Sequence, residues 1–213
     1  MSIGELVDGP LWYASLGIFV VGVALRLIGA LMLGSKPDFS VARGSASSGA
    51  IKANLRYFLP RKGFWPRLKM QVVAGYLFHL GLFALLFFAL PHVQFYERVF
   101  GLSLPVIPNW AFILAAEAAF LGLMFLWLHR VMHPVTQAIS DRGDRFTSWL
   151  IFLVMLTGCL ALGRTHESLR IIHFLLAELL LAWFPFSTLM HTFTFAFSRG
   201  AHGAHFGRRG VPI

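Results

Sequence analysis

Residues 169–198 read LRIIHFLLAELLLAWFPFSTLMHTFTFAFS and form the last hydrophobic segment of a 213-residue chain. His173 and His191 lie 18 residues apart in it, and 18 steps of 100° make five complete turns of an α-helix. On one straight helix both imidazoles would point the same way. At about 1.5 Å per residue they would be roughly 27 Å apart along the axis, nearly the thickness of the hydrocarbon core of a bilayer. We expect one histidine near each membrane face.

The composition predicts an integral membrane protein. Hydrophobic residues make up 57% of the chain, charged residues 13%, and the mean hydropathy is +0.71, which is outside the usual balance of a soluble domain. Apolar runs of bilayer length satisfy their backbone groups in lipid as helices. The sequence therefore predicts an all-α bundle of five transmembrane helices in a single membrane domain, residues 1–213. The five runs cover approximately residues 11–33, 70–90, 110–129, 146–162 and 169–197.

The distribution of basic residues predicts the orientation. Segment 36–69, the loop after the third run and the tail carry fourteen Lys and Arg, whereas the N-terminus and the two other loops carry three. Because cytoplasmic loops carry the excess of Lys and Arg, we expect the N-terminus outside and the C-terminus in the cytoplasm. The net charge of +9 therefore reflects topology and not a nucleic-acid surface. The fourteen are Lys36, Arg43, Lys52, Arg56, Arg61, Lys62, Arg67, Lys69, Arg130, Arg142, Arg145, Arg199, Arg208 and Arg209; the three are Arg98, Arg164 and Arg170.

Two histidines from different runs match in depth. His79 is ten residues after Lys69, and His191 is eight residues before Arg199, so they would lie about 15 Å and 12 Å from the same membrane edge. A neutral histidine at such depth can be an interhelical hydrogen-bonding group. Intramembrane ionisable residues are, however, functional by default. The matched depths predict that His79 and His191 face each other.

Paired imidazoles from two helices indicate haem. Two neutral histidines are the protein ligands of a six-coordinate haem iron, and an apolar macrocycle suits a helical core. Gly75 and Gly81 flank His79 and would let a bulky planar group approach the backbone. Zinc fits less well because structural zinc sites need four ligands, usually including cysteine. The single cysteine, Cys159, excludes an iron–sulfur cluster.

The last run also resembles a known family. It is similar to the haem-binding last helix of the respiratory nitrate reductase gamma subunit family, which includes cytochromes b associated with dissimilatory sulfite reductase and with heterodisulfide reductase. The Phe-Pro-Phe-Ser element between two histidines is its most specific part, and the resemblance extends over all five runs. The matching residues are Arg170-Ile-Ile-His173, Phe184-Pro-Phe-Ser-Thr-Leu-Met-His191, Phe78-His79-Leu80-Gly81, Arg130, Pro134 and Asp144.

The resemblance implies a haem b subunit of a respiratory complex, located in the cytoplasmic membrane of a bacterium or archaeon. Such a subunit transfers electrons between the membrane quinone pool and a soluble iron–sulfur partner on the cytoplasmic side, and does not itself act on the terminal substrate. His79 and His191 would hold the inner haem, in agreement with their matched depths. Arg26, within the first run, would pair with a haem propionate or extend its guanidinium to the cytoplasmic interface.

The sequence alone does not decide whether the chain binds a second, outer haem. In the nitrate reductase branch its ligands are the first histidine of the last helix, here His173, and a histidine ten residues after the first one of helix two, where this chain has Ala89. His92 is the nearest substitute, but it lies about 60° around the helix from Ala89 and could serve only if Pro91 bends the chain. Otherwise His173 contributes to a quinone site near the outer face. Candidates for that site, which can hydrogen-bond or take up protons, are His173, Arg170, Glu178 and His92.

Two other functions remain compatible with the sequence. One is a haem-free membrane anchor or transporter, in which the histidines only hold helices together. Transporters usually show inverted repeats or broken helices, and apart from Pro185 the sequence shows neither. The other is a cytochrome b that serves a hydrogenase or another dehydrogenase.

Overall fold

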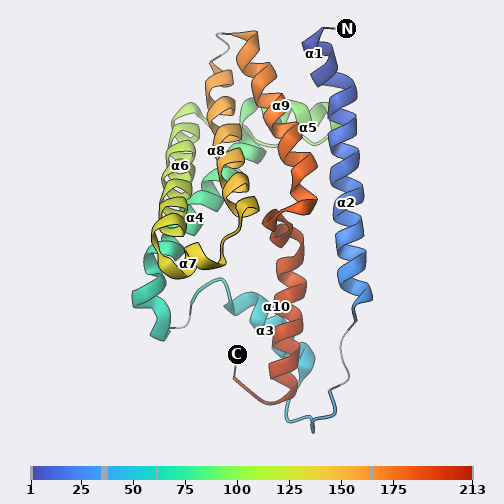
Figure 1. The fold of residues 1–213 in the computed structure, drawn as a ribbon, viewed down its shortest axis with the longest axis vertical. Helices are drawn as coiled ribbons and strands as arrows, with labels where there is room; N and C mark the ends of the chain where they lie inside the picture. Colours follow the sequence, from blue (N-terminus) through green and yellow to red (C-terminus); the bar gives the residue numbers. More distant parts are fainter. Residues whose placement is uncertain (1, 35–37, 61, 164–165, 213) are drawn as a thin grey trace. The chain divides into compact units, whose positions relative to one another are not determined.

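The computed structural model describes residues 2–34, 38–60, 62–163 and 166–212, and this part of the chain contains helices and no strand (Figure 1). Lys36, Arg61 and Arg164, which belong to the charge distribution above, lie outside the described residues. Within the described residues, five helices are long and apolar enough to cross a membrane, which agrees with the predicted number of spans. They are Ile3–Met32, Lys62–Phe88, Asn109–Met132, Arg142–Leu162 and Glu167–Phe186.

The chain divides into two compact units. Unit 1 comprises Met1–Trp12 and Arg67–Leu180, and unit 2 comprises Tyr13–Pro66 and Leu181–Ile213. The α-helices are α1 (Ile3–Leu6), α2 (Trp12–Met32), α3 (Ala46–Arg56), α4 (Trp65–Phe88), α5 (Leu90–Phe100), α6 (Asn109–Met132), α7 (Pro134–Ile139), α8 (Arg142–Leu162), α9 (Glu167–Trp183) and α10 (His191–Arg208). A π-helical turn covers Val7–Leu11, and 3-10 turns cover Lys62–Phe64, Phe184–Phe186 and Thr188–Met190.

In unit 1, α4 and α6 are in backbone contact because glycines face the neighbouring helix. A Cβ added to Gly81 would lie 2.4 Å from the carbonyl oxygen of Ala115, and one added to Gly122 would lie 2.5 Å from that of Ala74. Small residues allow such close approach between membrane helices. Gly81 therefore serves helix packing, whereas the sequence suggested that it made room for a planar group beside His79.

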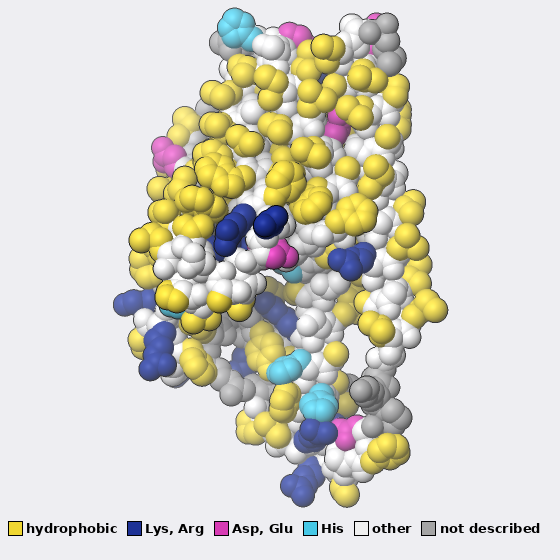
Figure 2. All heavy atoms as spheres, viewed as in Figure 1, with side chains coloured by type: hydrophobic (Ala, Val, Ile, Leu, Met, Phe, Trp, Pro, Cys, Tyr) yellow, Lys and Arg dark blue, Asp and Glu magenta, His cyan; other side chains and the backbone are white. Residues whose placement is uncertain are grey.

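The lipid-facing character of the bundle is visible on its surface. Leu80, Ile113 and Leu121 expose 65%, 54% and 68% of their surface. Figure 2 shows hydrophobic side chains across the visible flanks of the helices, with few charged groups between them. Apolar side chains that lie outward in such numbers need a bilayer around them, because water would penalise a contiguous patch of this kind.

The second span ends in a sharp break. Helix α4 stops at Phe88, Ala89 is extended with φ −69° and ψ 136°, and α5 begins at Leu90 with Pro91 in its first turn. Proline has no N–H to donate to the preceding turn and its ring clashes there, so a helix cannot run through it unchanged. Pro91 at the start of a new helix satisfies both restrictions. The chain therefore bends at Pro91, which is the condition under which His92 could act as the ligand in place of Ala89.

The last apolar run is also broken and differs from the single straight helix expected over residues 169–197. Helix α9 ends at Trp183, and two 3-10 turns separate it from α10. Pro185 lies in the first turn, and Ser187 is extended with φ −111° and ψ 172°. The Ser187 hydroxyl accepts from the Leu189 N–H at 3.2 Å and so begins the second turn. The five-turn relation between His173 and His191 therefore does not hold.

Candidate functional site

His92 and His173, the two candidates for the outer haem in the sequence, lie next to each other in unit 1. Their rings are 6.2 Å apart between centroids and are nearly parallel, with an interplanar angle of 23°. His92 comes from the first turns of α5, directly after the break at Ala89, and His173 from α9. The bend at Pro91 thus brings together two histidines whose pairing the helical angle alone opposed.

Backbone carbonyls fix how both imidazoles are turned. The Nδ1 atom of His92 lies 2.9 Å from the Leu85 carbonyl oxygen, and Nδ1 of His173 lies 3.1 Å from that of Val154. A carbonyl only accepts, so each Nδ1 carries the proton and each Nε2 carries the lone pair. This second contact is typical of metal-bound histidines, where it sets the tautomer and ring orientation.

Helix α8 provides the surface against which the His173 ring lies. A Cβ on Gly158 would be 2.9 Å from Cε1 of His173, closer than real Cβ contacts allow. The Thr157 hydroxyl lies 3.4 Å from Nδ1 of the same ring. Only glycine at position 158 leaves the imidazole its place, a requirement that the sequence analysis did not identify because the glycine and the histidine are on different helices.

The inner candidates show the same tautomer pattern, each within its own unit. Nδ1 of His79 lies 2.7 Å from the Gly75 carbonyl oxygen in unit 1, and Nδ1 of His191 lies 2.7 Å from the Thr188 carbonyl oxygen in unit 2. His79 also contacts the Phe78 ring edge to face at 4.9 Å. All four predicted ligands therefore present Nε2 as the nitrogen with the lone pair.

Arg26 binds a backbone carbonyl in unit 2. Its Nε donates to the carbonyl oxygen of Pro185 at 3.0 Å. One turn earlier on α2, a Cβ at Gly22 would lie 2.5 Å from Cγ of Pro185, so the absence of a side chain there admits the proline ring. The helix break and the intramembrane arginine thus form one structural feature, which neither sequence interpretation of Arg26 included.

The polar candidates on α9 divide into paired and unpaired groups. Arg170 donates to both carboxylate oxygens of Asp8 at 2.8 and 3.0 Å and to Glu167 at 2.7 and 2.9 Å, and its guanidinium lies 5.1 Å from the Phe174 ring centroid. Arg170 is therefore engaged and differs from the open quinone-binding group expected from the sequence. Glu178 is 3% exposed, and neither carboxylate oxygen has a hydrogen-bond partner among the described residues.

A further polar cluster lies at the other end of α6 in unit 1, where the sequence suggested only the end of a helix. Nε2 of His129 contacts the side-chain amide of Gln71, and the His129 and His133 rings stack at 4.8 Å. Arg130 pairs with Asp144 at 3.4 Å, which joins two residues quoted in the family resemblance. These contacts hold α4, α6 and α8 together at one end.

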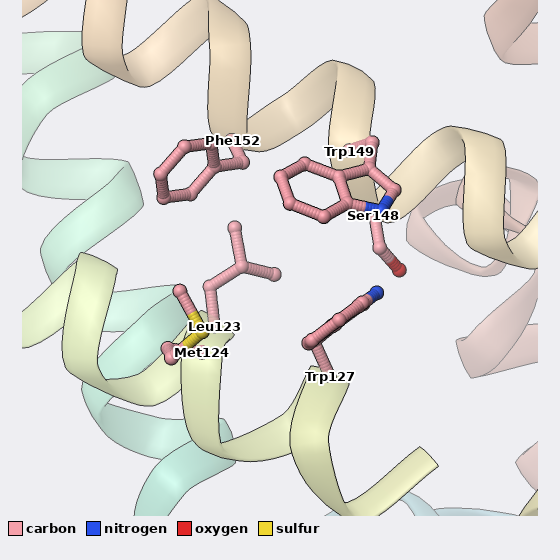
Figure 3. A pocket seen from close by; sticks show the side chains of 6 residues that line it. All are labelled: Leu123, Met124, Trp127, Ser148, Trp149 and Phe152. Carbon is pink, nitrogen blue, oxygen red and sulfur yellow. The ribbon is translucent and has the colours of Figure 1, made fainter. Parts of the chain in front are cut away.

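A small aromatic pocket lies between α6 and α8 (Figure 3). It contains no histidine and so does not form part of the predicted haem sites. Its lining residues are Leu123, Met124, Trp127, Ser148, Trp149 and Phe152.

Among the described residues, side chains that could bind a metal occur as pairs of histidines and not as larger clusters. Across residues 2–34, 38–60, 62–163 and 166–212, no group of three or more His, Cys, Asp or Glu side chains is placed to hold a metal ion. A haem iron takes four ligands from its macrocycle and two from the protein. A two-histidine site is thus the one kind that the described donor set suits.

Comparison with known proteins gives one relative over nearly the whole chain. The sequence is 27% identical over 210 residues to a protein of Nitratidesulfovibrio vulgaris strain Hildenborough, covering 92% of this chain and 90% of the other. The name of that relative, "Protein", refers to no ligand or activity. No protein-family model and no solved structure matches the chain.

Proposed function

We propose that this chain is the haem-binding membrane subunit of a respiratory complex, and that it carries electrons between the membrane quinone pool and a soluble iron–sulfur partner on the cytoplasmic side. The observation that carries the proposal is the pairing of His92 with His173. Two imidazoles that held one iron would have ring centres roughly 6 Å apart, because a metal–nitrogen bond to imidazole is about 2 Å and the ring centre lies roughly 1 Å further. The ring centres of His92 and His173 are 6.2 Å apart, and because the rings are stacked, both would turn to bring Nε2 toward a shared iron.

The surroundings of the two rings also fit haem. The carbonyls of Leu85 and Val154 hold the Nδ1 protons, which leaves the lone pairs on Nε2 for iron. Gly158 gives the His173 ring its room. We therefore propose His92 and His173 as ligands of the outer haem, and His79 and His191, from their sequence depths and shared tautomer, as ligands of the inner haem. Haem b, when bound, supplies a one-electron carrier in the apolar core.

Among the quinone-site candidates, the structure favours Glu178. His92 and His173 lie against each other as a stacked pair, and Arg170 is held by Asp8 and Glu167. The Glu178 carboxyl is buried without a hydrogen-bond partner among the described residues, and it can accept a proton from a quinol hydroxyl. We propose that its carboxylate form takes up one of the two protons that quinol oxidation releases.

Single substitutions of the histidines test the proposal through the visible spectrum of the purified protein. We expect about two haems per chain in the wild type. His92→Leu or His173→Leu should each remove one low-spin haem, and His79→Leu or His191→Leu should each remove the other, because an imidazole is one of two axial ligands. His166→Leu, at an exposed position directly before α9, is the matched control and should keep both.

Two outcomes would contradict the proposal. A wild-type protein without Soret and alpha bands would leave the haem-free anchor as the function. A full low-spin signal in both His92→Leu and His173→Leu would refute the outer ligands even if haem is bound elsewhere.

A further inference from the structure

In unit 2, α3 and α10 form a tightly interlocked pair. A Cβ on Gly49 would lie 2.2 Å from the Gly203 carbonyl oxygen, and one on Gly207 would lie 2.7 Å from Cα of Gly49. Near the other end of α3, the Asn54 side-chain amide donates to the Ala196 carbonyl at 3.2 Å. The helices are therefore antiparallel and in backbone contact. We call residues 38–60 and 191–212 the tail module.

The chain before α3 is irregular but held firmly to the end of α10. The N–H groups of Arg43 and Gly44 donate to the Arg208 carbonyl at 2.8 and 3.1 Å. The Arg208 side chain in turn donates to the carbonyls of Asp38 and Ser40 at 3.4 and 3.3 Å. This segment is ordered by long-range bonds without being part of a helix.

An ion pair adds to this anchor. Arg209 lies 3.4 Å from the Asp38 carboxylate. Hydrogen bonds from Ser40, together with Arg209, lower the pKa of Asp38 to about 2, so the carboxylate is charged at neutral pH. The anchored segment nevertheless leaves Phe39 94% exposed and Val41 80% exposed. Large apolar side chains on a fixed backbone are typical of a binding surface.

Helix α3 continues the apolar surface on its side away from α10. Gly49 and Ala53 are buried, whereas Ile51 and Leu55, one turn apart, are 63% and 73% exposed. Leu59, just beyond the helix, is 63% exposed. Exposed apolar residues therefore extend along α3 and over the anchored segment.

The tail module that carries these apolar side chains is basic. The tail module contains six Lys and Arg residues and one acid, Asp38, a surplus of five positive charges (6 − 1). The acid is already paired with Arg209. A partner that covers the apolar residues must therefore carry negative charge around its own apolar patch. The basic residues are Arg43, Lys52, Arg56, Arg199, Arg208 and Arg209.

The occupant is a protein and not the lipid surface, because α10 separates its residues along its axis. Residues 191–198 carry no Lys, Arg, Asp or Glu, whereas residues 199–209 carry three Arg. A helix that lies in the membrane plane separates them by face instead. The Arg199 guanidinium lies 4.7 Å from the Phe58 ring centroid and 5.4 Å from that of Phe195, an arrangement of basic and aromatic side chains typical of the membrane edge.

Distance along α10 supports the same conclusion. From Arg199 to Arg209 is ten residues, or about 15 Å along a helix, whereas the headgroup layer on each side of a bilayer is only roughly 5–8 Å thick. With Arg199 at the membrane edge and α10 along the membrane normal, Phe39 and Val41, held beside Arg208 and Arg209, would lie beyond the lipid headgroups.

We infer that the tail module is the docking surface for the soluble electron-transfer partner, which presents an apolar patch with an acidic rim. This inference rests on the proposed function for the nature of the partner. The apolar side chains of Phe39, Val41, Ile51 and Leu55 form the centre of the contact, and Arg43, Lys52 and Arg56 guide and orient the acidic protein.

Protection of a cysteine at position 39 tests the inference even while the partner is unidentified. Phe39→Cys is placed in a Cys159→Ala background and treated with a bulky water-soluble maleimide. In nanodiscs of phosphatidylcholine and phosphatidylglycerol the thiol should react freely. In native membranes with the cytoplasmic face accessible, labelling should be at least about tenfold slower, as for a site that is mostly occupied. High salt should remove the protection, and the salt-released proteins should restore it.

Charge variants provide the matched comparison. Arg43→Glu with Lys52→Glu should abolish the restored protection, whereas Arg142→Glu with Arg145→Glu, which reverses two charges outside the tail module, should leave it intact. Protection already present in nanodiscs would assign the surface to lipid and overturn the inference. Free labelling in native membranes, or restoration by a protein without a redox centre, would also overturn it. The haem spectrum of the same membranes tests the proposed function separately.

Discussion

At the scale of single residues, the outer pair depends on groups that are not ligands. The His173 imidazole lies where a Cβ at Gly158 would be 2.9 Å from its ring. The ring orientation also depends on the Val154 carbonyl of the same helix. Helix α8 therefore positions the ring of His173, the ligand that we propose on α9.

Replacing Gly158 tests this positioning role. Gly158→Ala should displace the His173 ring and remove the outer low-spin haem signal while leaving the inner one, because one methyl group occupies the imidazole's place. Haem-to-protein ratio and low-spin resonances measure the change. Gly17→Ala is the control, since its added Cβ meets nothing within 4 Å. Retention of both haems in Gly158→Ala would contradict the role.

Arg26 stabilises the helix break, and its removal has a predictable cost. Arg26→Leu leaves the Pro185 carbonyl without its donor inside an apolar region. We expect a loss of about 1–3 kcal/mol, the usual cost of an unsatisfied buried polar group, seen as a lower unfolding temperature in detergent. Leu25→Ala, on the exposed neighbouring position, should change it much less. Equal stability of Arg26→Leu and wild type would show that the hydrogen bond contributes little.

The charge of Asp38 predicts a pH response in the anchored segment. Its pKa is lowered to about 2, so its contribution to stability is complete above the ordinary carboxyl pKa of about 4 and is lost as the pH falls toward 2. Hydrogen exchange of the Arg43 and Gly44 amides should be slow at pH 5 and lose protection near pH 2 relative to the intrinsic rate. In Asp38→Asn the protection should already be reduced at pH 5. Unchanged protection in the variant would contradict the role of the ion pair.

At the scale of elements, the break between α4 and α5 brings His92 to His173. Pro91→Ala restores the N–H and removes the steric restriction, so α4 can extend and rotate His92 away from its partner. We expect loss of the outer haem signal with the five spans intact by circular dichroism. Pro105→Ala, in the irregular segment before α6, is the control. If Pro91→Ala keeps both haems, the remaining contacts of α5 suffice to fix the bend.

At the scale of the whole molecule, the charge distribution predicts the orientation in the membrane. A reporter fused at the C-terminus should map to the cytoplasm and one fused at the N-terminus to the outside, because fourteen of the loop and tail cations lie on one predicted side. Paired alkaline phosphatase and green fluorescent protein fusions measure this. A C-terminal fusion with high phosphatase activity would overturn the orientation and, with it, the location of the tail module.

The sequence predicted the part of the structure that depends on local hydrophobicity. All five spans were identified because each is a long apolar run, and α6 and α8 extend only a few residues beyond their predicted ends. The pairing of His92 with His173 stayed open because it depends on the backbone conformation of a single residue, Ala89. The roles of Gly158 and Asp8 were missed because they arise from contacts between distant helices. The break at Ser187 was missed because the hydrophobic pattern continues through it.

The source of each Nδ1 contact has a consequence for how such sites are inherited. His79 and His191 bond to carbonyls four and three residues before them, so each ring is oriented by its own turn of chain. His92 and His173 bond across a helix break and across two helices. Divergence elsewhere in the sequence can therefore erase the outer pair while both histidines persist. We expect relatives of this chain to retain the ring orientations of His79 and His191 longer and to lose the arrangement of His92 and His173 repeatedly and independently.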